Sequence, residues 1–132
     1  MQLKPQNGSV RNPATNKKTL DDNMSWLYLL LAGCFEMGWP IGLKLSQAPQ
    51  SSTNKTILWI AVSVICMTIS GFFLWMAQRH IPIGTAYAVW TGIGAVGTFI
   101  IGISFFGDHV NVWKLVSVTF LIMGIIGLKI AH

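Results

Sequence analysis

Charged side chains are scarce in this sequence, and nearly half of them lie near one end. Only 10% of the 132 residues are Asp, Glu, Lys or Arg, whereas soluble domains carry about 25%. Six of the thirteen charges fall within residues 1–23. The net charge of +5 reflects a shortage of acids, without the clustered Lys and Arg that bind nucleic acid. We therefore expect no nucleic-acid partner and predict a membrane protein.

Cysteine and histidine are also few. Cys34 and Cys66 both lie inside apolar runs, where we expect them to act as small buried hydrophobic residues. His80, His109 and His132 have no second ligand at a useful helical spacing. The sequence shows no nucleophile–base pair and no phosphate-binding loop. We therefore expect no metal, no cofactor and no enzymatic activity.

Long apolar runs dominate the rest of the chain. A helix needs about 20 apolar residues to cross the roughly 30 Å hydrocarbon core. Transmembrane β-strands are about half that length and alternate in polarity, so the runs predict an all-α membrane protein. The four predicted spans are residues 25–45, 57–77, 83–106 and 112–131.

Residues 1–24 form a polar, basic N-terminal tail. Its composition lacks the apolar residues that could bury surface, so we predict disorder. Met24 could equally be the first translated residue, in which case the tail is an upstream extension.

Glu36 is an acidic residue about halfway along the first predicted span. A charge at bilayer centre costs at least about 2.5–3.5 kcal/mol, which a sequence normally carries only where the group faces a cavity or a partner. One interpretation is a carboxyl that binds and releases protons. The alternative is a neutral, hydrogen-bonded residue that only joins helices. Pro40, four residues later, has no N–H for the Glu36 carbonyl, so we expect a kink there. Gly33 and Trp39 should place a small gap and an aromatic wall beside the carboxyl.

The third span offers aromatic groups suited to a cation. Tyr87, Trp90 and Gly94 share one helical face, with π surfaces for a cation and N–H and O–H donors for orientation. Interfacial anchoring or plain close packing would explain them as well. Gly92, Gly94 and Gly97 leave this helix poorly stiffened, so it could bend.

Two further sets of small residues concern contacts between helices. Ser70 in the second span can hydrogen-bond a carboxyl, or only its own backbone. Gly124 and Gly127 make the fourth span a candidate contact surface. Four helices leave little room for a substrate, so self-association that brings two copies of Glu36 together would supply a cavity.

Positive charge is almost balanced across the predicted membrane. Apart from the tail, one side holds Arg79 and Lys129, and the other holds Lys44, Lys55 and Lys114. The positive-inside rule therefore has little effect on this core, which could insert in both orientations. The tail, with three basic residues close to the first span, would bias the N-terminus inward.

Three stretches resemble the small multidrug resistance transporters, and specifically their guanidinium-exporter subfamily. They are Gly33-Cys34-Phe35-Glu36, the run from Pro82-Ile83-Gly84-Thr85 through Ala86-Tyr87-Ala88-Val89-Trp90-Thr91-Gly92-Ile93-Gly94-Ala95-Val96-Gly97, and Gly124-Ile125-Ile126-Gly127-Leu128-Lys129. The resemblance covers essentially all of residues 24–132.

The resemblance implies a proton-coupled antiporter in the bacterial inner membrane, active as an antiparallel, dual-topology homodimer. Residues 25–132 would be its four-helix transporter domain. Glu36 would bind either protons or a guanidinium-type cation, and a kink at Gly92 and Gly94 would alternate access. The matching pocket positions are Gly33, Trp39, Ser70, Tyr87 and Trp90.

The sequence departs from the family at Pro40, in the longer linker after the first span and in the tail. Two other functions therefore stay open. One is export of bulkier quaternary ammonium or hydrophobic cations, and the other is the role of an inactive partner subunit in a heteromeric pair.

Overall fold

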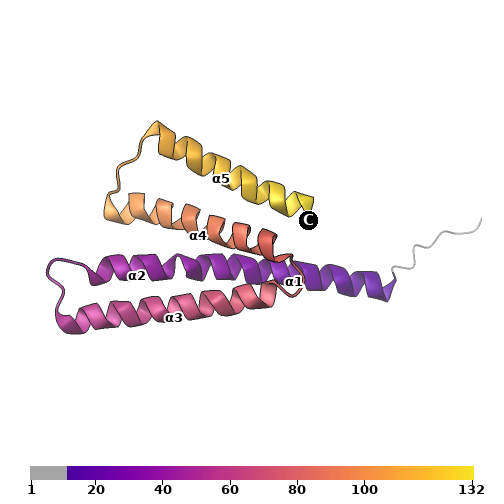
Figure 1. Ribbon diagram of the computed structural model, residues 1–132, viewed down its shortest axis with the longest axis horizontal. Helices are drawn as coiled ribbons and strands as arrows, with labels where there is room; N and C mark the ends of the chain where they lie inside the picture. The colour runs from indigo at the N-terminus through magenta and orange to yellow at the C-terminus, as the bar shows by residue number, and fades with distance from the viewer. Residues whose placement is uncertain (1–11) are drawn as a thin grey trace, which may run out of the picture.

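The computed structural model describes residues 12–132, which form five α-helices and no strand. Four stretches are long and apolar enough to cross a membrane: residues 13–46, 53–77, 83–106 and 112–131. The helices are α1 (Pro13–Glu36), α2 (Gly38–Ser46), α3 (Thr53–Ala77), α4 (Ile83–Phe106) and α5 (Val112–Ala131). Figure 1 shows α2 continuing the line of α1, after which α3, α4 and α5 run back and forth along the long axis of the molecule.

The first helix begins well before the predicted span. Pro13 stands at the first helical position, where its missing N–H costs nothing. The Asn12 side chain caps this end by accepting from the Ala14 N–H at 3.2 Å. Residues 13–24 thus belong to the same helix as the first span, although their polar composition favours disorder, because the capped start and the apolar residues that follow extend the helix into the polar segment. Residues 1–11 lie outside the described part of the chain.

A single residue interrupts the first span. Met37 separates α1 from α2, and helical bonding resumes when the Ile41 N–H donates to the Met37 carbonyl at 3.4 Å. Pro40 has no N–H for the Glu36 carbonyl, which is the physical cause of the break. The interruption lies one residue after Glu36, and Met37 itself keeps helical angles (φ −65°, ψ −28°), so the kink expected from Pro40 stays a prediction. By contrast, α4 runs unbroken past Gly92, Gly94 and Gly97.

The ends of α4 and α5 are set by local backbone chemistry. Gly107 adopts a left-handed conformation with φ of +67°, and its N–H donates to the Gly102 carbonyl. This conformation ends α4, and glycine adopts it without steric cost. The Asn111 side chain then accepts from the Lys114 N–H at 2.9 Å and caps α5.

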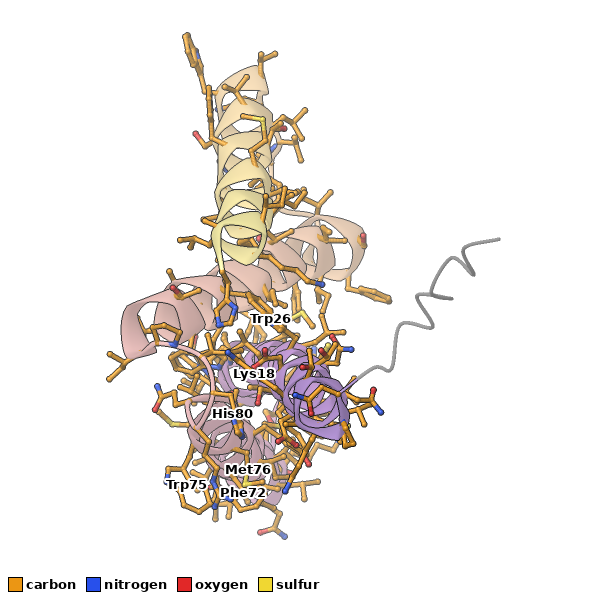
Figure 2. All side chains as sticks on the ribbon, turned by 90° about the vertical axis from the view of Figure 1, so that its right-hand side faces the viewer. Lys18, Trp26, Phe72, Trp75, Met76 and His80 are labelled. Carbon is orange, nitrogen blue, oxygen red and sulfur yellow. The ribbon has the colours of Figure 1, made fainter. Side chains whose placement is uncertain are left out.

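The first span is the centre of the bundle. α1 packs against both α3 and α4, α2 packs mainly on α3, and α5 packs on the outer side of α4. The fully buried apolar core is small: Leu29, Ala32, Ala77, Ile81, Ala86 and Val89. In the end view of Figure 2, α5 stands away from α1, which carries Lys18, and from α3, which carries Met76.

Most apolar surface faces outward, as expected for a protein in lipid. No residue of α5 is buried, and a methyl group added at Gly124 or Gly127 would meet nothing within 4 Å. The start of the first span and the chain terminus meet at one end of the bundle. There the Trp26 ring packs edge-on against the His132 ring, and the Lys129 ammonium lies over the Trp26 ring. This contact fits an even number of membrane crossings between Trp26 and His132.

Candidate functional site

The Glu36 carboxylate is held at the break between α1 and α2. Its Oε1 accepts a hydrogen bond from the Trp39 indole Nε1 at 2.8 Å. Donor and acceptor are three residues apart, and the Met37 backbone between them keeps helical angles (φ −65°, ψ −28°), so both side chains lie on one helical face. Glu36 is partly buried.

Ser70 of α3 holds the other carboxylate oxygen. Its hydroxyl lies 3.1 Å from Glu36 Oε2 and 2.7 Å from the Ala32 carbonyl oxygen. A serine hydroxyl has one proton to donate, so these two acceptors share or compete for it. Ser70 is fully buried, and its hydroxyl is therefore shielded from exchange with bulk water.

Trp90 of α4 completes a hydrogen-bonded chain. Its indole Nε1 donates to the Ser70 hydroxyl oxygen at 2.9 Å. The ring of Tyr87 lies 5.2 Å from the Trp90 ring, centroid to centroid. Tyr87 is more than half exposed, whereas Trp90 is partly buried. Side chains from three spans thus meet at one carboxylate.

Two glycines set how closely α1 and α4 approach, and each adjoins a different side chain. A methyl group at Gly94 would stand 2.7 Å from Glu36 Cγ, so the acidic side chain lies directly against α4. At Gly33 the same methyl group would stand 2.5 Å from the Ile93 side chain. The gap predicted beside the carboxyl at Gly33 is therefore filled by Ile93, and Gly94 is the glycine that adjoins the acid.

A groove of about 470 Å³ opens onto the carboxylate between the first span and α4. We call it the Glu36 groove. It is large enough for a small organic cation and, apart from the acids, is lined by apolar and hydroxyl groups. Its lining residues are Glu36, Trp39, Pro40, Thr91, Gly94, Ala95, Thr98, Phe99 and Asp108.

The arrangement suits a cation or a proton better than a metal ion. A carboxylate offers about four acceptor positions, and Trp39 and Ser70 use one on each oxygen. The remaining positions stay available for the N–H groups of a ligand. Within residues 12–132, no three His, Cys, Asp or Glu side chains lie together as metal ligands would.

The sequence-predicted site residues are only partly brought together. Glu36, Trp39, Ser70 and Trp90 form one hydrogen-bonded chain, and Tyr87 joins it through ring contact. Gly124 and Gly127 lie on the open face of α5 and take no part in these contacts.

Sequence reasoning missed several groups around the carboxylate. The Ala32 carbonyl carries no sequence signal, because any residue supplies one. Thr91 and Thr98 share a face of α4 with Gly94, since they lie three and four residues from it, and that spacing could have revealed them. Asp108 lines the same groove from the turn after α4. Its distance from Glu36 along the chain hid this relationship.

Comparison with known proteins assigns the family. Residues 24–121 match the family model described as Small Multidrug Resistance protein. The match begins within α1, covers the next two spans in full and ends midway along α5, so it leaves out residues 12–23 and the second half of the fourth span.

Individual relatives agree with this match. The chain is 44% identical over 108 residues to a guanidinium exporter of Proteus vulgaris. This alignment covers 82% of this chain and 99% of the relative. A guanidinium exporter of Escherichia coli strain K12 is 43% identical, and one of Citrobacter freundii is 44% identical. Each of these two alignments covers 82% of this chain and 98% of the relative. The chain thus belongs to the small multidrug resistance family, and its four apolar helices make it a multi-pass protein of the bacterial inner membrane.

Proposed function

We propose that the protein exports guanidinium or a small guanidinyl cation in exchange for protons, and that both compete for Glu36. The observation that carries the proposal is the partly buried carboxylate with one donor on each oxygen and a groove in front of it. The names of relatives more than 40% identical support the choice of cation.

The geometry favours a planar cation with several N–H donors. Charge-assisted bonds between guanidinium groups and carboxylates are short, strong and often bidentate. Trp39 and Ser70 fix the carboxylate plane from two sides, so its free acceptor positions point in defined directions. A ligand with matching N–H groups gains from this preorganisation, because little side-chain freedom is lost on binding.

Proton binding would change the same hydrogen bonds. A protonated Glu36 presents an O–H group and a weaker acceptor, and it loses the charge that attracts the cation. The Ser70 hydroxyl then has the Ala32 carbonyl, 2.7 Å away, as its alternative acceptor. Ser70 can thus satisfy its one donor in either state of the acid, so neither state leaves a buried O–H unpaired.

A second copy of the chain would complete the site. The Glu36 groove is open on one side, and α5 leaves an entire apolar face uncovered. An antiparallel homodimer packed through Gly124 and Gly127 would cover this face and bring a second carboxylate to the cation. Two ionised carboxylates close together repel each other, and a cation bound between them would offset that repulsion.

Flux in liposomes tests the coupling. Purified full-length protein is reconstituted with an internal pH dye, and a guanidinium gradient should drive proton movement in the opposite direction. Glu36→Gln keeps the shape but cannot titrate, so both fluxes should fall to the level of empty liposomes. Asp21→Asn, on the polar extension of α1, is the matched control and should transport normally. Guanidinium uptake without proton movement, or a fully active Glu36→Gln variant, would refute the mechanism.

The same liposomes separate the two substrate classes. Tyr87 exposes its ring beside Trp90, and aromatic faces attract quaternary ammonium ions. Tetraethylammonium should compete weakly with guanidinium if hydrogen bonds to Glu36 dominate. Strong competition together with no guanidinium flux would favour export of hydrophobic cations.

A further inference from the structure

The Glu36 groove continues outward into a second hollow between α2 and α4. This outer pocket has a volume of about 230 Å³ and shares Pro40, Thr98 and Asp108 with the Glu36 groove. It extends as far as Lys44, near the end of α2. The two hollows adjoin each other. Lys44 lines only the outer one, whereas Asp108 lines both, so the acid stands where the path from the carboxylate opens outward.

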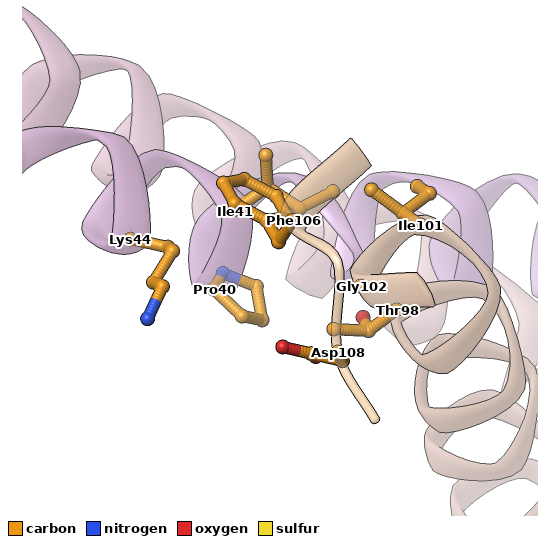
Figure 3. A pocket seen from close by; sticks show the side chains of 8 residues that line it. All are labelled: Pro40, Ile41, Lys44, Thr98, Ile101, Gly102, Phe106 and Asp108. Atoms are coloured by element: carbon orange, nitrogen blue, oxygen red, sulfur yellow. The ribbon is translucent and has the colours of Figure 1, made fainter. Parts of the chain in front are cut away.

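Lys44 and Asp108 belong to opposite walls of this path. Lys44 is carried by α2, which packs on α3, whereas Asp108 follows α4, which packs on α1 and α5. Figure 3 shows the two charged side chains on either side of Pro40, apart from each other. Both residues are exposed, so each charge is solvated in this arrangement.

Asp108 is held at the rim by backbone bonds. Its N–H donates to the Gly102 carbonyl at 3.1 Å, and the left-handed Gly107 turns the chain back toward α4. Its carboxylate lies so close to Gly102 that any larger residue there would displace it. The acid therefore has a fixed place facing the path, while Lys44 has a long flexible side chain that can reach across it.

We propose that Lys44 and Asp108 form an ion pair that closes the outer end of the Glu36 groove, and that the arrangement described here is its open form. Helical hydrogen bonding between α1 and α2 is interrupted at Met37, which removes one restraint on the position of α2 relative to α4. An exposed ion pair shifts a two-state ratio by up to about fivefold. That is enough to favour the closed form and weak enough to release in every cycle.

The role of this pair in transport rests on the proposed function, but the closure can be measured without any transport. Spin labels on Leu43→Cys in α2 and Phe105→Cys in α4 report the distance between the walls, because both side chains are exposed. The full-length chain also carries Cys34→Ala and Cys66→Ala and is reconstituted in lipid. We expect a short-distance and a long-distance population.

Four charge variants test the pair. Lys44→Gln and Asp108→Asn should each reduce the ratio of short to long distances by up to about fivefold, and the reversed pair Lys44→Asp with Asp108→Lys should restore it. Lys55→Gln, which removes a positive charge from the start of α3 outside the path, should leave the ratio unchanged. Salt at 1 M should reduce the ratio in the unsubstituted pair, because exposed charges are screened.

The proposal would be overturned if neither single variant changed the ratio of short to long distances. It would also be overturned if the reversed pair lowered that ratio by the combined effect of two single variants instead of restoring it. Loss of guanidinium flux with an intact distance response would count against the proposed function alone. Normal flux with no distance response would count against the ion pair alone.

Discussion

The side chain of Glu36 lies directly against Gly94, so the acid of the first span and the glycine-rich helix α4 are in van der Waals contact. A methyl group at Gly94 would stand 2.7 Å from Glu36 Cγ and 3.1 Å from its Cβ. The size of residue 94 therefore controls where the carboxylate sits. This contact links the position of α4 to the position of the acid.

Gly94→Ala should displace Glu36 from its two donors and reduce guanidinium-driven proton flux by at least about tenfold. Overpacking of this kind typically costs about 1–3 kcal/mol, and the displaced part here is the acid itself. Flux in liposomes is the measurement. Gly71→Ala is the control, because a methyl group at Gly71 meets nothing within 4 Å. Equal flux in both variants would show that the contact is unimportant.

Ser70→Ala removes the hydroxyl that links Glu36 to Trp90. The Trp90 N–H loses its acceptor and Glu36 loses one donor, and an unsatisfied buried group costs about 1–3 kcal/mol. We expect guanidinium affinity to fall by about tenfold or more. Isothermal titration of the purified protein measures the change.

Ser63→Ala is the matched control for that experiment. Ser63 is also a buried serine of α3, but its hydroxyl donates only to the Trp59 carbonyl within the same helix. Its loss should leave guanidinium affinity nearly unchanged, since this hydroxyl bonds within its own helix and takes no part in the hydrogen bonds at Glu36. An equal loss of affinity in both variants would assign the effect of Ser70 to helix stability.

Trp39→Phe keeps an aromatic ring but removes the N–H that donates to Glu36 Oε1 at 2.8 Å. The ionised carboxylate loses a charge-assisted bond worth about 1.5–3 kcal/mol, so proton binding should become more favourable. The pH at which protons displace half of the guanidinium should rise. Titration of guanidinium binding against pH measures it, with Trp59→Phe as the control outside the site. An unchanged or lowered midpoint would contradict the assigned role of Trp39.

The helical extension of α1 should affect membrane orientation. Lys17 and Lys18 lie on α1, the same helix that enters the first span. They are close enough to that span for the positive-inside rule to act. Lys17→Gln with Lys18→Gln should increase the fraction of chains whose N-terminus faces outward, measured with a reporter fused to the C-terminus. Asp21→Asn with Asp22→Asn should have little effect, because acidic residues contribute little to orientation. Orientation that does not respond to the lysines would contradict this prediction.

The sequence alone determined the four membrane-crossing helices, because a run of about 20 apolar residues in lipid must satisfy its backbone within itself and therefore becomes helical. Length and composition were enough to predict the bounds of α4 and α5. Pro40 shows from the sequence alone that the Glu36 carbonyl lacks a helical N–H partner. Glu36 itself was evident, because an acid inside an apolar run is costly and rarely accidental.

Tertiary structure decided which groups surround that acid. Helical periodicity gives the face on which a residue lies, but it does not say which neighbouring helix covers that face or at what depth. Only the packing of α1 between α3 and α4 brings Ser70 and Trp90 to Glu36, fills the space at Gly33 with Ile93 and places Asp108 in the same groove. These contacts depend on how whole helices pack against each other, and no local sequence pattern encodes that packing.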